Sequence, residues 1–353
     1  MRALTVIPEK PGSLEVVELP DPSPGPGDLL VESLSVGVCG TDKEIVRGDY
    51  GRAPEGAERL VLGHESLGRV REAPQGSGFT AGDFVTGLVR RPDPVPCGAC
   101  AAGEFDMCRN GKYTEHGIKE LHGFASDMWC AEPERVVKLD PTLGESGVLV
   151  EPTSVVAKAW EQIQLIGDRA WFEPERVLVT GAGPIGLLAA LLGVQRGLDV
   201  HVLDRVSDGP KPRLVRELGA TYHHDDSETV AARLRPDVVV EATGAGKVVV
   251  DVLAGTAPYG IVCLTGVSSG GRVLRFDVGA VNRELVLEND AVVGSVNANL
   301  RHYRAAAEAL AAADPGWLGG LITRKVPLAK AEEAFTAQPE DVKVVITLDG
   351  GAA

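Results

Sequence analysis

A glycine-rich segment in the middle of the chain restricts the possible folds more than any other feature. Residues 176–180 are an apolar run typical of a buried strand, 181–186 are Gly-Ala-Gly-Pro-Ile-Gly, and 187–194 have the composition of a largely buried helix. In such a unit the three glycines permit a tight turn, close approach of a pyrophosphate and close helix packing. The helix N-terminus then faces the phosphates, and a proline is well tolerated there. The segment predicts a dinucleotide site in an α/β fold, with a glycine turn that binds nothing as the alternative; the expected cofactor contacts are Gly181, Gly183, Pro184, Ile185 and Gly186.

An acidic residue ends the next predicted strand, 199–204. Asp204 stands 18 residues beyond Gly186, where a carboxylate would accept hydrogen bonds from the adenosine ribose. This position favours NAD. Arg205 or Lys211 could instead pair with a 2′-phosphate if Asp204 turned aside, so NADP, or use of both nucleotides, stays open.

The chain of 353 residues is longer than one core usually supports, and its pattern changes near residue 151. Before that point, short apolar runs such as 29–36, 66–71 and 83–89 are divided by Gly and Pro, which predicts a strand-rich, barrel-like domain. After it, strands and helices alternate as in a doubly wound parallel sheet. A helix is expected at 301–313, a break at 314–316, and strands at 322–326 and 342–348. We therefore expect a nucleotide-binding domain, 152–296, inserted into a first domain made of 1–151 and 297–353.

Three residues of types that zinc prefers stand at separate places in the first domain: Cys39, His64 and Glu151. Three protein ligands leave the fourth position for water or a substrate oxygen, as in catalytic zinc sites. Such a metal lowers the pKa of a bound hydroxyl, so that hydride can leave to a nicotinamide. Thr41 could carry the proton away, and Glu65 could orient the site or bind zinc transiently. Taken singly, each residue also has an ordinary structural explanation.

Composition excludes several classes of partner. The net charge of −15, without a basic run, argues against nucleic acid or an anionic membrane, and no stretch approaches 18 apolar residues. The N-terminus lacks the features of a signal peptide, so a cytoplasmic enzyme with a small neutral substrate is expected. Cys97, Cys100 and Cys108 fall close together, which indicates metal ligation in a reducing compartment.

Taken together, these residues resemble the zinc-containing medium-chain dehydrogenases over essentially the whole chain. The segments 38–42, 63–68, 82–85 and 151–152 and the glycine turn occur in that family's order. Within it, the chain looks most like the glucose 1-dehydrogenases, through 113–119, 121–124, 282–285, 294–299 and 301–303, and through Glu151 where many relatives have cysteine. The resemblance implies a GroES-like β-rich catalytic domain and a Rossmann nucleotide domain.

Carried over to these positions, the resemblance implies zinc at Cys39, His64 and Glu151, with Glu65 as an alternating or water-mediated ligand. It also implies sugar contacts at Glu115 and His302, beside Thr41 and Glu151 near the reacting oxygen, and Asn297 on the nicotinamide side. A carboxylate, an imidazole and a hydroxyl can together recognise a polyol. Glu115 as a solvated loop residue and His302 as a solvated residue at a helix start are the alternatives.

The sequence departs from the family pattern at two places. Glu44 stands where many relatives have the histidine of the proton relay. The family's structural-zinc lobe has four cysteines spaced C-x2-C-x2-C-x7-C; Cys97, Cys100 and Cys108 fit the last three and Pro94 occupies the first. Asp93 could complete a tetrahedron for a structural zinc, or the lobe could fold without metal. In relatives this lobe is remote from catalysis and closer to subunit contacts.

The leading functional hypothesis is a zinc-dependent oxidoreductase that transfers hydride from C1 of a glucose-like aldose to NAD(P) and gives the lactone. A cyclitol, nucleotide-linked sugar or other polyol dehydrogenase is the nearest alternative, because one fold serves many substrates. A catalytically inactive nucleotide-binding protein is the alternative of another class. A homodimer or homotetramer is expected.

Overall fold

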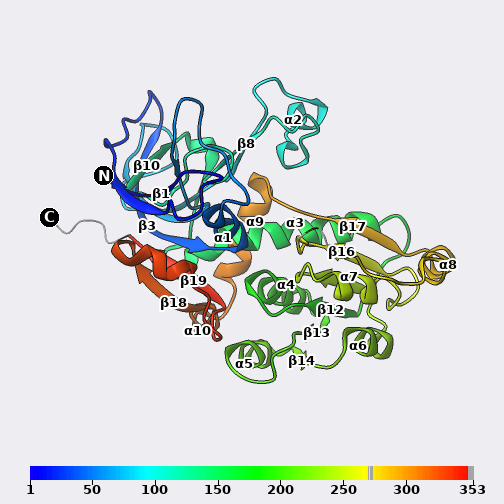
Figure 1. Ribbon diagram of the computed structural model, residues 1–353. Coiled ribbons are helices and arrows are strands. Elements are labelled where there is room, and N and C mark those ends of the chain that lie inside the picture. The colour runs from blue at the N-terminus through cyan, green and yellow to red at the C-terminus, as the bar shows by residue number, and fades with distance from the viewer. Residues whose placement is uncertain (269, 271–272, 349–353) are drawn as a thin grey trace. The chain divides into compact units, whose positions relative to one another are not determined.

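The computed structural model describes residues 1–268, 270 and 273–348 as two compact units. The first contains Met1–Ser154 and Ala298–Ala353, and the second contains Val155–Asn297 (Figure 1). These junctions lie within a few residues of the expected ones at 151/152 and 296/297. Among the described residues, none of the helices combines the length and the apolar character needed to cross a membrane.

The first unit is built on a seven-stranded sheet in the order β11-β6-β5-β3-β19-β18, with β10 also paired to β3. Strand β3 (Leu29–Val38) is its centre, and it buries Leu29, Val31 and Val36 in the core of this unit. Two of the strands, β18 (Ile322–Pro327) and β19 (Lys343–Thr347), come from the C-terminal part of the chain. The second unit is therefore an insertion in the first, as the sequence pattern predicts.

Smaller elements complete the first unit, including the three-stranded sheets β2-β1-β4 and β7-β8-β9. The α2 segment stands out from the β-rich body (Figure 1). Helix α9 (Leu300–Ala311) ends just before the break expected at 314–316, and Asp314 then caps helix α10, its side chain accepting a hydrogen bond from the backbone N–H of Trp317 at 2.7 Å. The bounds are β1 (Arg2–Val6), β2 (Glu15–Glu18), α1 (Gly40–Arg47), β4 (Leu60–Val61), β5 (Glu65–Glu72), β6 (Phe84–Gly87), β7 (Arg90–Arg91), α2 (Gly98–Ala101), η1 (Phe105–Met107), β8 (Thr114–His116), β9 (Glu120–Leu121), β10 (Met128–Ala131), η2 (Pro133–Arg135), β11 (Val136–Lys138), η3 (Pro141–Leu149), α9 (Leu300–Ala311), α10 (Pro315–Leu321) and η4 (Leu328–Phe335); α3 (Val150–Gly167) continues into the second unit.

The second unit is a six-stranded, wholly parallel sheet in the order β14-β13-β12-β15-β16-β17. Its central strand β12 (Arg176–Thr180) is followed directly by the glycine turn and α4 (Pro184–Gln195). Order and direction are those of the doubly wound dinucleotide-binding fold, so the predicted fold class is confirmed. The other bounds are β13 (Asp199–Leu203), α5 (Pro210–Glu217), β14 (Thr221–His223), α6 (Ser227–Leu234), β15 (Val238–Glu241), α7 (Gly246–Val252), β16 (Ile261–Leu264), α8 (Val278–Glu288) and β17 (Ala291–Gly294).

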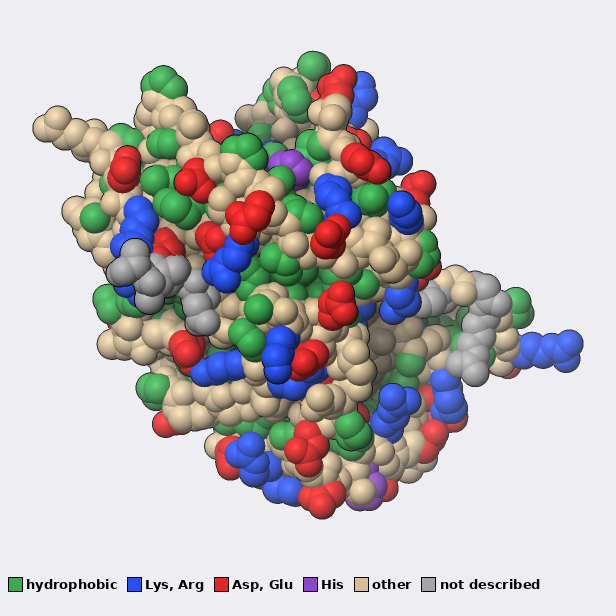
Figure 2. All heavy atoms as spheres, turned by 60° about the vertical axis from the view of Figure 1, so that its left-hand side comes forward, with side chains coloured by type: hydrophobic (Ala, Val, Ile, Leu, Met, Phe, Trp, Pro, Cys, Tyr) green, Lys and Arg blue, Asp and Glu red, His purple; other side chains and the backbone are tan. Residues whose placement is uncertain are grey.

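Acidic and basic side chains are interspersed over the face drawn in Figure 2. Over the whole sequence acidic residues outnumber basic ones, which gives a formal net charge of −15. A mixed surface of this kind offers no extended basic footprint on that face, which agrees with the prediction of a small neutral substrate.

A buried histidine makes the stability of the first unit dependent on pH. His116 stacks on Phe124 at 4.5 Å between ring centroids, and its Nδ1 lies 2.6 Å from the carbonyl oxygen of His122. Burial, reinforced by the nearby Arg91 charge, lowers the pKa of His116 to about 3. The unfolded chain would take up this proton near pH 6.5, so stability is expected to fall as the pH drops from about 6.5 toward 3, by at most about 1.4 kcal/mol per pH unit.

Urea unfolding at pH 7.5, 6 and 5 checks this expectation against His116→Gln. The wild-type midpoint should fall more steeply than that of the variant between pH 6.5 and 5, where few carboxyl groups titrate. Parallel curves for the two proteins would contradict the assignment of this pH dependence to His116.

Candidate active site

Three potential metal ligands of the first unit meet where β3 ends and β5 begins. One ligand atom each from Cys39, His64 and Glu65 lie within 4.8 Å of one another, and Cys39 Sγ is 3.1 Å from His64 Nε2. The antiparallel register pairs Gly37 with Glu65, which brings the residues that follow β3 next to those at the start of β5. A Cβ on Gly37 would stand 1.9 Å from Glu65 Oε2, so any larger residue there would displace this carboxylate.

The loop after β3 fixes the thiol by helix capping. Cys39 is the N-cap of α1, and its Sγ accepts a hydrogen bond from the backbone N–H of Thr41 at 3.2 Å. Asp42 completes a capping box, because its Oδ2 accepts a hydrogen bond from the backbone N–H of Cys39 at 2.9 Å. Thr41 thus lies in the first turn of α1, beside the thiol, and its role near the reacting oxygen stays a prediction.

Asp42 is a site residue that the sequence analysis missed. Its Oδ1 lies 3.3 Å from His64 Nδ1, so the carboxylate orients the ring and leaves Nε2 toward Cys39. Burial opposes the charged imidazole, but Asp42 and Cys39 outweigh it and the pKa of His64 is raised. The capping-box spacing of Cys39 and Asp42 was the available signal for this residue.

Lys343 is the second missed residue. Its ammonium forms an ion pair with Glu65, and both side chains are almost fully buried, at 1% and 3% exposed. The lysine Nζ also donates to the backbone oxygen of Val38 at 3.4 Å. Burial opposes the lysine charge, yet Glu65 dominates and the pKa of Lys343 is raised. No local pattern could reveal the pair, because β19 reaches β3 only through the tertiary fold.

Glu151 lies in the first turn of α3, within the electrostatic reach of the same group. Burial raises the pKa of Glu151 to about 7, with Glu65 adding to the rise while His64 and Lys343 oppose it. Its carboxyl is not among the atoms that share the 4.8 Å group. The pKa of the Tyr303 phenol, on α9, is raised well above its usual value, first by burial and then by the nearby Glu151 carboxylate.

The donor set fits a zinc ion. A thiol, an imidazole and carboxylates are ligand types that zinc takes, and the three gathered atoms are close enough to converge on one ion. Asp42 on the far nitrogen of His64 is the usual outer support of such a ligand.

The two predicted sugar contacts are both buried in the first unit. Glu115 is on β8 and is 5% exposed, and His302 is in the first turn of α9 and is 2% exposed. Neither is the solvated residue that the alternative interpretation required. Arg90 on β7 binds Glu115 Oε1 with Nε at 3.0 Å and Nη2 at 2.9 Å.

The cysteine lobe brings three thiols together. Cys97, Cys100 and Cys108 place their sulfur atoms within 4.8 Å of one another. Asp93, the tentative fourth ligand, is not part of that group: its carboxylate accepts hydrogen bonds from the backbone of Val95 and from the Asn110 amide, each at 2.8 Å. Both carboxylate oxygens thus accept hydrogen bonds within the loop, and the structure does not gather Asp93 with the three sulfur atoms.

The glycine turn of the second unit has the geometry that each position predicts. Gly181 adopts a φ of +93°, and a Cβ on Gly186 would stand 1.7 Å from the oxygen of Gly181. A Cβ on Gly183 would meet nothing within 4 Å, so protein packing does not require that glycine. Close approach of a ligand remains its physical explanation. Pro184 begins α4, directly after the N-cap Gly183.

Asp204 is held at the end of β13. Its Oδ2 accepts from the backbone N–H of Ala182 at 2.7 Å and from Lys211 Nζ at 3.2 Å, and its Oδ1 accepts from the backbone N–H of Arg205 at 2.8 Å. Burial alone would raise the pKa of Asp204, but these donors outweigh it and the pKa lies below its usual value. The residue lines a cavity of about 550 Å³ together with Gly181, Gly183, Arg205 and Lys211.

Comparison with known proteins gives a consistent result. Residues 144–348 match the family model described as glucose dehydrogenase C-terminus, and 25–141 match the alcohol dehydrogenase GroES-like domain. The glucose 1-dehydrogenases of Thermoproteus tenax and Methanocella arvoryzae are 42% and 38% identical, over 98% and 99% of this chain and 99% of each relative. The chain belongs to the glucose 1-dehydrogenase family. The solved glucose dehydrogenase of Haloferax mediterranei, in complex with NADP, Zn and gluconolactone, is similar with a TM-score of 0.91, 34% identity and 99% coverage of both chains.

Membership of the glucose 1-dehydrogenase family confirms the recognised resemblance and the two domain types. It does not by itself assign residues, and the predicted roles of Glu65, Glu115, His302 and Asn297 stay predictions. Asn297 ends the second unit with a φ of +61°, and the Lys158 ammonium donates to the adjoining Val296 oxygen at 3.0 Å.

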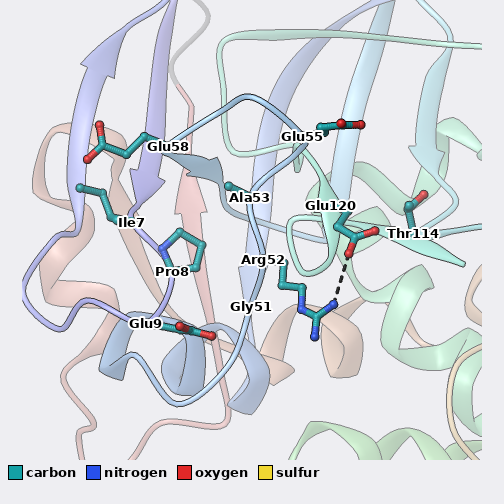
Figure 3. Close-up of a pocket in the computed structure, with 10 residues that line it drawn as sticks. All are labelled: Ile7, Pro8, Glu9, Gly51, Arg52, Ala53, Glu55, Glu58, Thr114 and Glu120. Atoms are coloured by element: carbon teal, nitrogen blue, oxygen red, sulfur yellow. Dashed lines mark hydrogen bonds and ion pairs between the residues drawn. The ribbon is translucent and has the colours of Figure 1, made fainter. Parts of the chain in front are cut away.

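Another cavity of the first unit, of about 740 Å³, contains none of the predicted site residues (Figure 3). Its walls include Arg52 and Glu120, which form an ion pair at 3.4 Å. Volume alone therefore does not identify the site; the gathered ligands and the glycine turn do.

Proposed function

We propose that this member of the glucose 1-dehydrogenase family is a zinc-dependent NAD(P) dehydrogenase that oxidises C1 of a glucose-like aldose to the lactone. The observation that carries the proposal is the convergence of Cys39, His64 and Glu65, with Glu151 in reach, in a chain that also has the complete dinucleotide turn. Metal and nucleotide together indicate hydride transfer from a hydroxyl-bearing carbon.

The residues have distinct roles in this proposal. Cys39, His64 and Glu151 hold the zinc, which when bound polarises the substrate hydroxyl and lowers its pKa. Asp42 keeps the His64 ring oriented, and Lys343 fixes Glu65 beside the thiol. Thr41 relays the proton that the hydroxyl loses: its oxygen takes up that proton while its own proton passes on toward the cofactor ribose and solvent. Glu115 and His302 bind the remaining sugar hydroxyls, which gives the site its preference for a polyol over a simple alcohol.

The nucleotide site suits both forms of the cofactor. Asp204 offers a carboxylate at the ribose position, whereas Arg205 and Lys211 supply the positive charge that a 2′-phosphate needs. Because Lys211 already contacts Asp204, a bound 2′-phosphate would have to replace that ion pair. We expect activity with NAD and with NADP.

The three thiols of the lobe are proposed to hold a second, structural zinc. All of them are free in the structure, as a reducing compartment such as the cytoplasm would keep them. Deprotonation is favoured at Cys97, where hydrogen bonds from the backbone of Arg109 and Cys100 lower the pKa to about 6.

The reduction of NAD and NADP, followed by absorbance with zinc-loaded protein, tests the activity. Glucose, its epimers, a cyclitol, a nucleotide-linked sugar and simple alcohols form the panel. Turnover with an aldose and production of the lactone are expected, with the cyclitol and the simple alcohols much slower. Tight nucleotide binding without turnover of any substrate would instead support an inactive binding protein. Faster turnover of the cyclitol than of any aldose would show that the substrate is a cyclitol.

A second copy of the chain is expected to bind along the edge of the second unit. Within the described part of the chain, strand β17 pairs with β16 alone, so its outer backbone groups are available for another strand. Large apolar side chains are exposed on β17, just after it and on α8, the helix that precedes it in the chain. They are Val278, Val286, Leu287, Val292 and Val296. Such an apolar edge favours a symmetric dimer.

Light scattering after size exclusion tests this interface. Val292→Lys should convert the dimer to monomer at micromolar concentration, because it places a charge on the paired edge. Val16→Lys on β2, another edge strand with an exposed valine, is the matched control and should not change the mass. An unchanged mass for both variants would rule out this edge as the contact.

A further inference from the structure

The 3-10 turn η1 (Phe105–Met107) lies directly before Cys108 of the cysteine lobe. It forms hydrogen bonds with neighbours of both candidate sugar contacts. Its middle residue, Asp106, is 4% exposed. The backbone oxygen of Asp106 accepts from Arg90 Nη1 at 3.0 Å, and its Oδ1 accepts from Asn299 Nδ2 at 3.0 Å. One buried residue thus contacts two others, each of which leads to a predicted substrate residue.

The first connection reaches Glu115. Arg90 uses Nε and Nη2 on Glu115 Oε1 and Nη1 on Asp106, while its guanidinium lies 3.6 Å from the centre of the Tyr113 ring. Arg90 and Glu115 are also partners in the register of β7 and β8. The planar Arg90 guanidinium is therefore fixed by three groups, the Glu115 carboxylate, the Asp106 carbonyl and the Tyr113 ring, and a lysine could not make all these contacts. The orientation of the Glu115 carboxylate follows that of Arg90.

The second connection reaches His302. Asn299 caps α9: its Oδ1 accepts from the backbone N–H of Arg301 at 3.1 Å, so its amide nitrogen must face Asp106. The backbone N–H of Asn299 donates to His302 Nδ1 at 3.0 Å. His302 Nδ1 is thereby an acceptor, and the neutral ring carries its proton on Nε2. The bond to Asp106, with a longer one from Nδ2 to Glu104 Oε2 at 3.4 Å, helps to hold the cap, and the backbone N–H of the capped residue sets the tautomer.

We propose that Asp106 is a positioning residue for sugar recognition, holding Glu115 through Arg90 and His302 through Asn299. This rests on the proposed function, because it takes Glu115 and His302 as the sugar contacts. It gives the cysteine lobe a part in substrate binding, in addition to the structural part that the resemblance implies. Asp106→Ala removes the carboxylate arm and keeps the backbone carbonyl, so it should disturb the His302 side specifically.

Steady-state kinetics with glucose tests the proposal. Asp106→Ala should raise KM for the sugar about tenfold, since a buried bond to a charged acceptor is lost, while kcat and KM for the nucleotide change less than about threefold. Asp106→Asn keeps an oxygen acceptor for Asn299 and should restore most of the affinity. Arg90→Lys should raise the same KM through Glu115. Glu132→Gln removes the ion pair of an exposed carboxylate with Arg91. Because Glu132 contacts neither Asp106 nor Asn299, this variant is the matched control and should stay near wild type.

A measurement independent of turnover separates this proposal from the proposed function. In the zinc-loaded protein without sugar, imidazole ¹⁵N shifts should report His302 with its proton on Nε2 in the wild type and in Asp106→Asn, and a mixture of tautomers in Asp106→Ala. If no aldose is oxidised but the tautomer changes as described, the proposed function fails and the positioning role stands.

Three results would overturn the positioning role. The first is an unchanged sugar KM together with unchanged His302 shifts in Asp106→Ala. The second is a variant that only loses thermal stability or zinc. If Asp106→Ala does not fold, Asn299→Ser removes the amide donor while keeping a good N-cap, and wild-type KM and shifts in that variant would be the third.

Discussion

Replacing Cys39 with serine is expected to lower kcat/KM for the sugar by about a thousandfold or more and to remove one zinc per chain. The thiolate is the only sulfur ligand of the group, and loss of the metal removes several kcal/mol of stabilisation of the developing charge. Serine is the better test than alanine, because Cys39 is also the N-cap of α1 and a serine hydroxyl keeps that cap. The fold should therefore persist.

Turnover, zinc content per chain and circular dichroism of the same preparations check this result, with Cys100→Ser as the matched control. Cys100→Ser should also lose zinc, from the lobe, but its main effect should be a lower thermal midpoint, with kcat retained at saturating sugar. Equal loss of kcat in both variants without unfolding would show that the two metal sites have been assigned wrongly. Full zinc content and activity in Cys39→Ser would remove Cys39 from the site.

Replacing Lys343 with methionine is expected to destabilise the first unit by about 3–5 kcal/mol, because Glu65 would be left as a buried charge without its partner. Lys343 and Glu65 are 1% and 3% exposed, so water cannot compensate for the loss. Methionine retains most of the lysine stem, which limits the contribution of lost packing. Activity should fall as well, because Glu65 stands beside the thiol and imidazole.

The double variant Lys343→Met with Glu65→Gln provides the control. It removes both charges, so it should be more stable than Lys343→Met alone, and the coupling between the two positions follows from urea unfolding of the four proteins in a double-mutant cycle. The cycle should be run with and without zinc, since a bound metal would partly neutralise Glu65. Additive effects would show that the pair contributes no mutual stabilisation.

Much of the fold could be predicted from local patterns. The strand at 176–180, the helix after the glycine turn, and the insertion of one domain into another follow from apolar periodicity and glycine placement, which report short-range preferences. The helix Val278–Glu288 and the helix α10 were not predicted, because caps such as Asp277 and Asp314 are weak signals without a strong apolar pattern behind them.

Residue types were sufficient to nominate Cys39, His64, Glu65 and Glu151, because zinc ligation requires particular side chains and their order along the chain matches a known pattern. The same holds for the glycine turn, where a positive φ at Gly181 and the close approach at Gly186 leave no other residue possible. The partners of these residues could not be nominated in this way. Lys343 reaches Glu65, and Asp106 reaches Arg90 and Asn299, across long separations in sequence, and only the packing of β19 and η1 against the rest of the unit creates those contacts. Burial in that packing is also what moves the pKa of Glu151 to about 7, since a charge loses its hydration only when the folded chain surrounds it.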